Sequence, residues 1–478
     1  MMAVPYLRWL GIAILVTTLN PKYAVAASNV EQARPSGIAK IKMSASRSEL
    51  RQLRDKGYDI AGFNLKTGTA DVVITTDQET LSLLAEGFTV KSVDTIDTTL
   101  APDSDYKTPE EVYEILNDWA RNYPGLAHLE SLGKSLKGTE LWGLRISNDA
   151  ATREAKPAVL FNAEHHSREV MTVEVVLDTA EYLLTRYGSD PRVTSWVDRN
   201  NIWVVPMVNP DGSHMVWTSN NMWRKNGRGN YGVDINRNYP YMWSGCGGSS
   251  SMPWAQDFHG ASAASEPETQ IMMKLVERIK PVFNISYHSY SEIVIYPYGC
   301  DGRHAEDRDL VESIGKQLAD TIPSELGQGT YTPGTAWELL YDVDGSDIDW
   351  MYHDHHVLAY CIEVTSDQSG FQPPFSQRQS TVESVRPAWQ KLLDRLDQSG
   401  IHGTIRDNRG RPLANVSISI HSLDNLKATP GTWNTDAQGR FHAILAPGNY
   451  NVRFSAGPLT GDRTVRVADK VVTSDFEI

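Results

Sequence analysis

Two histidines and two glutamates stand close together in the segment Glu164-His-His-Ser-Arg-Glu169. His166 and Glu169 are three residues apart, which on a helical turn places both side chains on the same side. An imidazole and a carboxylate supply two of the three protein ligands that a catalytic zinc needs, leaving a fourth position for water. A His-x-x-Glu pair alone is a common surface pattern, so a third ligand is required. His288, 119 residues after Glu169, is the obvious donor, since it follows the predicted strand 282–287.

Short apolar runs must position these side chains. Residues 158–162, 202–206 and 282–286 are apolar on both faces and are separated by helical patterns, one of which covers residues 170–186. Such runs are typical of central strands in an α/β sheet. Ligands at a strand end and in the next turn project into the crevice where open α/β sheets bind substrates.

Several further motifs follow one another in a fixed order. They are His166-Ser-Arg-Glu169, Asn209-Pro-Asp-Gly212, Trp223-Arg-Lys225, Asp234-x-Asn-Arg-Asn238, Ser265-Glu-Pro-Glu268, His288-Ser-Tyr290, Tyr341 seven residues before Ile348-Asp-Trp350, and Glu363. This series closely resembles the zinc metallocarboxypeptidases of the pancreatic carboxypeptidase A and B type. The resemblance covers roughly residues 105–395 and implies the carboxypeptidase fold, a mixed central sheet flanked by helices.

The resemblance also implies roles for single residues. His166, Glu169 and His288 would bind one Zn²⁺ per chain, and Glu363 would be the catalytic carboxylate. Zinc lowers the pKa of a bound water to about 7, and a nearby carboxylate can pass the water's proton to the leaving amine. Arg224 matches the arginine that faces the scissile carbonyl and stabilises the developing oxyanion.

A second group of matched residues would recognise the substrate. Asn236 and Arg237 match the pair that holds the free C-terminal carboxylate, for which bidentate guanidinium pairing is well suited. Arg168 would add a positive charge further along the cleft. Tyr341 matches the tyrosine that closes over the bound terminus, with a packed core tyrosine as the alternative.

Ile348 stands at the base of the side-chain pocket, where apolar residues accompany aromatic or aliphatic substrates. Asp344 and Asp347 fall in the same loop and could attract basic side chains instead, so the residue preference is left open between these two readings. The other histidines, His165 among them, match no such position, and packing or surface roles are expected for them. The expected function is that of an exported zinc-dependent metallocarboxypeptidase that hydrolyses the C-terminal peptide bond, with a preference for apolar or aromatic residues.

Residues 105–397 are the predicted catalytic domain, and two segments precede it. Residues 1–27 read as a signal peptide, with Arg8, an apolar stretch and Ala24-Val25-Ala26 as a cleavage site, so a secreted or periplasmic protein is expected. Residues 28–104 are predicted to hold a small ferredoxin-like pro-region, because capping boxes at Ser46 and Thr76 each open a helix between strands. Residues 94–107 have the composition of an exposed linker. Such a pro-region could cover the cleft of a zymogen or serve folding alone.

Residues 401–478 change to short alternating strands with turns at glycines. They predict an all-β sandwich, and they resemble the transthyretin-like domain that follows the catalytic domain in other carboxypeptidases. A stabilising or partner-binding accessory role is expected.

The composition of the chain limits the kinds of partner that it can bind. The formal net charge of −14, with no basic run, argues against a nucleic-acid binder. No segment reaches the length of a transmembrane helix, and a monomer acting on peptides or proteins with free C-termini is expected. Of three cysteines, Cys361 lies in an apolar run, so Cys246 and Cys300 are the expected disulfide pair. A pseudo-enzyme would require the loss of a matched residue, and a relative acting on cell-wall peptides is less compatible with Arg237 and Tyr341.

Overall fold

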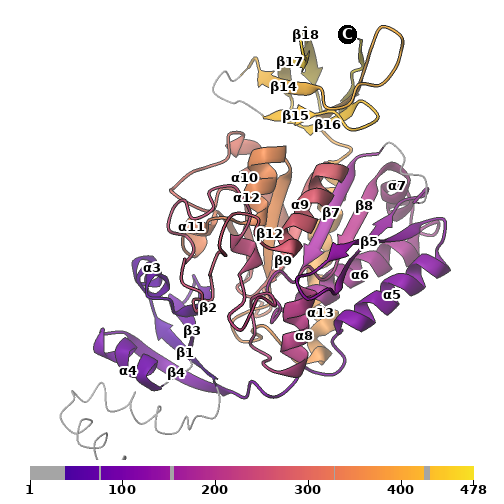
Figure 1. Ribbon diagram of the computed structural model, residues 1–478. Helices are drawn as coiled ribbons and strands as arrows, with labels where there is room; N and C mark the ends of the chain where they lie inside the picture. The colour runs from indigo at the N-terminus through magenta and orange to yellow at the C-terminus, as the bar shows by residue number, and fades with distance from the viewer. Residues whose placement is uncertain (1–37, 75–76, 151–155, 328, 425–430, 478) are drawn as a thin grey trace, which may run out of the picture. The chain divides into compact units, whose positions relative to one another are not determined.

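The computed structural model describes residues 38–74, 77–150, 156–327, 329–424 and 431–477 (Figure 1). The contacts divide the chain into two compact units, with the division between Leu100 and Ala101. The predicted signal peptide, residues 1–27, lies outside the described residues.

The N-terminal unit repeats the order strand, helix, strand. Its elements are β1 (Ile38–Ser44), α3 (Arg47–Asp55), β2 (Asp59–Asn64), β3 (Thr69–Ile74), α4 (Asp77–Ala85) and β4 (Thr89–Ile96). The strands form one antiparallel sheet in the order β2-β3-β1-β4, as the ferredoxin-like prediction requires. Ser46 and Glu49 form the predicted capping box at the start of α3. The second predicted box begins at Thr76, which lies outside the described residues.

The predicted linker is only partly a linker. β4 continues through Ile96, and residues 97–101 are mostly exposed. Tyr106, in contrast, is fully buried, donates its hydroxyl to the carbonyl of Pro373 at 2.7 Å and packs edge-on against Phe375. A fully buried aromatic ring holds its segment of the chain in place. The prediction of an exposed linker was therefore wrong for the C-terminal end of residues 94–107.

An eight-stranded mixed sheet forms the centre of the second unit. Its strands are β5 (Ala127–Lys134), β6 (Glu140–Ile146), β7 (Ala158–Ala163), β8 (Asn201–Val205), β9 (Pro281–Ser289), β10 (Ile293–Ile295), β11 (Thr332–Gly334) and β12 (Leu358–Val364). Their order is β11-β10-β12-β9-β7-β8-β6-β5. The four strands β12, β9, β7 and β8 run parallel at the centre, and antiparallel pairs lie on both sides of them. The predicted fold class is confirmed.

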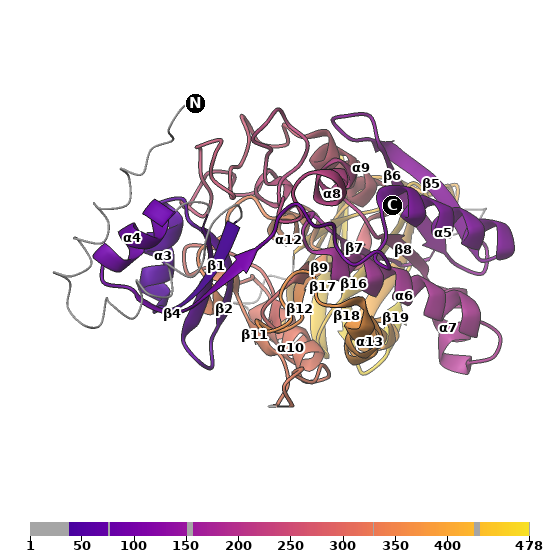
Figure 2. The same ribbon diagram turned by 90° about the horizontal axis from the view of Figure 1, so that it is seen from below.

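Helices cover both faces of this sheet. They are α5 (Pro109–Asn122), α6 (Val170–Arg186), α7 (Pro191–Arg199), α8 (Pro210–Thr218), α9 (Pro267–Ile279), α10 (Arg308–Ala319), α11 (Ala336–Leu339), α12 (Asp347–His355) and α13 (Arg378–Arg395). Figure 2 shows α9 and α12 on one side of the sheet and α6, α10 and α13 on the other. The central strands are buried throughout, so the apolar-on-both-faces pattern reflects a sheet covered twice. No helix among the described residues is long and apolar enough to cross a membrane.

The strand order creates a switch point beside β7. From β7 the chain passes to β8 on one side, and later to β9 on the other. Helices leaving in opposite directions open a crevice at the carboxyl ends of such strands. His166 follows β7, His288 is the penultimate residue of β9, and Glu363 lies near the end of β12.

The C-terminal part is a β-sandwich. Its strands are β13 (Gly400–Arg406), β14 (Ser417–Ser422), β15 (Thr432–Asn434), β16 (Arg440–Ile444), β17 (Gly448–Ala456), β18 (Leu459–Val467), β19 (Val471–Thr473) and β20 (Phe476–Glu477). They form two sheets, β16-β13-β19 with β20, and β15-β14-β17-β18, around a separate apolar core. Cys246 and Cys300 form the expected disulfide in the preceding domain, and Cys361 is buried and free.

Candidate metal centre and active site

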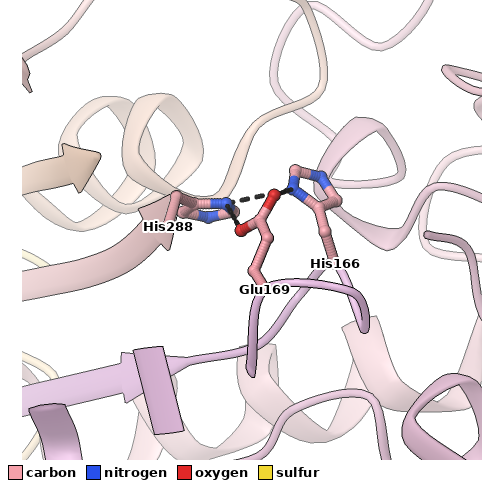
Figure 3. A group of neighbouring side chains, drawn as sticks. All are labelled: His166, Glu169 and His288. Atoms are coloured by element: carbon pink, nitrogen blue, oxygen red, sulfur yellow. Dashed lines mark hydrogen bonds and ion pairs between the residues drawn. The ribbon is translucent and has the colours of Figure 1, made fainter. Parts of the chain in front are cut away.

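Three buried side chains from two distant segments converge at the carboxyl ends of β7 and β9 (Figure 3). The Glu169 carboxylate lies between two imidazoles, with Oε1 2.8 Å from His166 Nδ1 and Oε2 3.0 Å from His288 Nδ1. The two Nδ1 atoms are 3.0 Å apart. A tetrahedral zinc with bonds of about 2.1 Å holds its ligand atoms about 3.4 Å apart, so this donor set fits zinc in type and spacing.

The segment that carries His166 and Glu169 is a turn rather than a helical turn. Glu164 adopts a left-handed conformation with φ +58°, and the amide of Glu169 donates to the carbonyl of His166 at 3.1 Å. Glu169 is the residue that precedes α6. The spacing of three residues still aligns the two side chains, because a tight turn also returns after three residues.

Charge and burial oppose each other in the cluster. Burial favours the neutral form of Glu169, but the charges and hydrogen bonds of His166 and His288 outweigh it and hold its pKa well below the ordinary value. Burial likewise favours neutral His288, yet the Glu169 carboxylate raises the pKa of His288 to about 9. The pKa of His166 is lowered by burial and by the Arg224 charge. The Glu169 carboxylate therefore offsets the free-energy cost of burying a positive charge in this cluster.

Asp234 orients His166 from behind. Its Oδ1 lies 3.2 Å from His166 Nε2, and its Oδ2 accepts from Arg224 Nη2 at 2.8 Å. A proton on Nε2 that is shared with this carboxylate leaves the Nδ1 lone pair free for a metal. Asp234 begins the Asp-x-Asn-Arg-Asn motif, but the sequence alone does not predict this contact with His166.

The other imidazole is also held in place. His288 Nε2 lies 3.3 Å from Asn236 Nδ2, and its ring stacks at 5.7 Å on the ring of His165. His165 in turn lies 3.0 Å from the Tyr239 hydroxyl and 3.9 Å from an oxygen of Asp347. His165 is thus buried and packed as expected, with the second ligand candidate as its neighbour.

Glu363 is opposite His288 in the parallel register of β12 and β9. Burial, with the nearby charge of Glu169, raises the pKa of Glu363 to about 8, and His288, Arg224 and Arg237 limit the rise. A carboxyl group whose pKa lies near neutrality can both accept and donate a proton.

Arg237 and Tyr341 lie within electrostatic reach of Glu363. The Arg237 side chain is buried, donates from Nη1 to the carbonyl of Asn236 at 2.8 Å, and has no hydrogen-bond partner at Nε among the described residues. Burial raises the pKa of Tyr341, while the charges of Arg237 and Arg224 oppose the rise. Arg224 approaches the cluster itself, with Nη1 3.9 Å from Glu169 Oε1.

The remaining predicted residues occupy the surroundings. Arg168 is buried and stacks on the Phe371 ring at 4.2 Å. Ile348 is buried in the first turn of α12. Asp344 accepts hydrogen bonds from the amides of Cys246 and Gly248, so this acid holds the loop beside the disulfide.

Known proteins with similar sequences show which family this chain belongs to. The family model described as zinc carboxypeptidase matches residues 112–388. The chain belongs to the zinc carboxypeptidase family. It is accordingly a metallocarboxypeptidase, a zinc-dependent peptide hydrolase. The model described as a carboxypeptidase regulatory-like domain matches residues 400–477, which are the sandwich.

Individual relatives agree with this membership. Carboxypeptidase A2 of Rattus norvegicus is 31% identical over 300 residues, which are 61% of this chain and 70% of the relative. A zinc carboxypeptidase of Saccharothrix mutabilis subsp. capreolus is 29% identical over 286 residues, 56% of this chain and 64% of the relative. The crystal structure of the carboxypeptidase A from Helicoverpa armigera shares the fold, with a TM-score of 0.65 at 22% identity, over 75% of this chain and 97% of that one.

Proposed function

We propose that this zinc carboxypeptidase is exported, binds one zinc ion through His166, Glu169 and His288, and removes apolar or aromatic residues from the C-termini of peptides. The observation that carries the proposal is the convergence of these three buried side chains on one point. Zinc held there supplies a water nucleophile at neutral pH and polarises the scissile carbonyl.

Glu363 and Arg224 act on the reacting atoms in this proposal. Glu363 takes the proton of the attacking water and delivers it to the leaving amine, a role for which its raised pKa is suited. Arg224 places a guanidinium where the oxyanion develops, and its bond to Asp234 fixes the direction of that guanidinium.

Recognition of a chain end requires a cation for the terminal carboxylate. Arg237 is buried with an unbonded Nε among the described residues, and Asn236 adjoins it. Tyr341 closes over the bound terminus, and Arg168 contacts residues further from the cut. A buried guanidinium makes a strong pair with a planar carboxylate, which explains cleavage at the end of a peptide only.

The preference for apolar residues is supported by Ile348 and by the use of Asp344 in the neighbouring loop. One observation favours basic residues as a second candidate. Both carboxylate oxygens of Asp347 are buried and have no hydrogen-bond partner among the described residues, although one lies 3.9 Å from His165 Nε2. We favour the apolar reading because His165 already faces this carboxylate.

The segments before the catalytic domain serve export and maturation in this proposal. Residues 1–27 direct secretion or passage to the periplasm, and residues 28–104 form the pro-region of a monomeric zymogen. Cleavage falls most readily in the exposed residues 97–101, since Tyr106 fixes the chain beyond them. A chain that starts at residue 105 should hydrolyse peptides faster than one that starts at residue 28, and equal rates would reduce the pro-region to a folding aid.

The catalytic role is tested by replacing Glu363 with Gln. Turnover of a C-terminal phenylalanine peptide should fall by about 10³-fold or more, while the zinc content, measured by atomic absorption, stays near one per chain. Glu383→Gln, at an exposed site of α13, is the matched control and should retain full activity. Retained turnover in Glu363→Gln would refute the role.

The preference is tested with peptides that differ only in the last residue. Wild-type kcat/KM should be higher for phenylalanine and leucine than for lysine and arginine. Asp347→Asn should leave that order unchanged; a selective loss of lysine and arginine cleavage would instead establish the basic reading. Amidated peptides should be poor substrates, and Arg237→Ala should raise KM far more for the free acids than for the amides.

A further inference from the structure

A hollow lies between the catalytic domain and the sandwich, and no step of peptide hydrolysis uses it. It has a volume of about 350 Å³ and is lined by the start of β9, the end of α9 and the segment from β15 to β16. A second hollow of about 190 Å³ adjoins it and shares Lys156, Asp436 and Arg440 as lining residues. The two form one groove.

The groove is far from the proposed zinc site. Val282 lines it at the start of β9, whereas His288 lies six residues later on the same strand. A rise of about 3.3 Å per residue separates the two positions by about 20 Å. Leu358, at the first position of β12, also lines the groove. The groove is therefore at the opposite edge of the sheet from the crevice.

The charge of the groove has the opposite sign to that of the chain. Five permanent cations line the two hollows: Arg145, Lys156, Arg278, Lys280 and Arg440. Only two acids, Glu277 and Asp436, line them as well. In a chain of formal net charge −14, such a local excess of positive charge attracts anions.

Two of these cations have capacity left for a ligand. The ammonium of Lys280 donates to the carbonyl of Thr435 at 2.9 Å and, at longer range, to Asn434 and Asn415, all neutral oxygens. Among the described residues no carboxylate lies within ion-pairing distance of it; burial lowers the pKa of Lys280, and the more distant charge of Asp436 opposes that shift only in part. Arg440 binds Asp436 through Nε and Nη2, but its buried Nη1 has no hydrogen-bond partner among the described residues. The Lys280 charge, which has no carboxylate within ion-pairing distance among the described residues, and the unbonded Nη1 donor of Arg440 are costly to bury unless an anion joins them.

The walls of the groove also include apolar surface. Trp433, Phe441 and Ile444 contribute from the sandwich, and Val282 from the sheet. Sites for small molecules commonly combine such walls with a few polar groups that fix the ligand's orientation.

We propose that this groove is an accessory binding site for a small organic anion with at least two negative charges, on phosphate or carboxylate groups, and an apolar body. The anion contacts Lys280 and the free edge of Arg440, and its apolar part lies against Trp433. Because both domains contribute to the site, the bound anion holds the sandwich to the catalytic domain and raises the stability of their assembly.

The test is calorimetric titration of the purified full chain with phenyl phosphate in one arm and phthalate in the other. Saturable binding in either arm supports the site and tells which anionic group it takes, and added salt should weaken binding. Lys280→Gln should weaken it about fivefold or more, the effect of losing one ion pair. Glu277→Gln, which removes an exposed acid from the rim, should strengthen it.

Lys316→Gln is the matched control, since Lys316 lies on α10 in an exposed ion pair with Asp320, and it should leave the affinity for both anions unchanged. Glu277→Gln excludes misfolding as the explanation, because a misfolded protein would not bind the anion more tightly. The absence of saturable binding in both arms, or affinities insensitive to Lys280→Gln and Glu277→Gln, would overturn the proposal. Peptide hydrolysis by these variants should equal that of the wild type, so the outcome is separate from the proposed zinc chemistry.

Discussion

Among the described residues, two imidazole pairs with ring centroids less than 5 Å apart behave in opposite ways. In the catalytic domain the rings of His166 and His288 have centroids 4.7 Å apart at 61°. In the sandwich, His402 and His442 face each other across β13 and β16, with centroids 4.4 Å apart at 87°. Distance and ring geometry alone do not separate a pair of candidate metal ligands from a packed pair.

The difference is the carboxylate. Glu169 lies between the first two rings and raises the pKa of His288 to about 9. No carboxylate of the described residues forms an ion pair with the second pair, and burial lowers the pKa of His402 to about 4. His402 Nε2 and His442 Nδ1 have no hydrogen-bond partner among the described residues. A buried acid thus turns two neutral packing groups into a set that can hold a cation.

The strongest way to break this comparison is to remove one imidazole from each pair. His288→Ala should lose its zinc and reduce peptide hydrolysis by about 10³-fold or more, because the Lewis acid is absent. His442→Ala should keep close to one zinc per chain and normal hydrolysis. Atomic absorption and a peptide assay measure both variants, and a loss of zinc in His442→Ala would contradict the distinction.

A smaller effect is expected from changing Asp234, the carboxylate that contacts the candidate ligand His166. Asp234→Asn keeps an oxygen that can accept the backbone amide of Asn236 but loses the charge that orients His166. Zinc affinity, measured by competition with a chelator, should fall about 10–100-fold. Asp462→Asn, at an exposed site on β18 where the carboxylate accepts a hydrogen bond from Asn451, should leave the affinity unchanged. Equal affinities in the two variants would show that Asp234 serves only to hold the loop.

The smallest effect concerns stability at low pH. The folded pKa of His402, about 4, is below the ordinary value of 6.5, so the unfolded chain binds the proton first. The stability that neutral His402 contributes is present above pH 6.5 and is lost as the pH falls toward 4, by up to about 3 kcal/mol. Urea unfolding followed between pH 7 and 4 should show this slope in the sandwich.

Leucine at both position 402 and position 442 should flatten the slope, since it removes both titrating groups without leaving a broken hydrogen bond. A slope of the same size in this double variant would mean that other groups cause it.

The sequence predicted the parts of the site that local pattern determines. Each of the apolar runs 158–162, 202–206 and 282–286 is a central strand, and the run 170–186 is α6. Strand ends on one edge of a parallel sheet are neighbours, so the sequence alone predicts that His166 and His288 lie close together. Motif order supplied Glu363, Arg224 and Arg237.

Contacts that depend on packing could not be predicted in this way. Asp234 and His165 contact the two ligand candidates from segments whose approach is set by loops without periodic pattern. The spacing of His166 and Glu169 predicts a helical turn, but a spacing of three residues also fits the tight turn that the structure has there. Tyr106 was placed in a linker because composition does not reveal the single aromatic ring that anchors it.

The register between β9 and β12 limits how this enzyme can vary in length. His288 and Glu363 are paired on adjacent strands, and successive residues of a strand point to opposite faces. A one-residue insertion or deletion within either strand would turn one of the two groups away from the other. Insertions and deletions are therefore expected in the loops that connect the strands and not within β9 or β12. Segments exchanged to change the specificity should likewise begin and end in these loops.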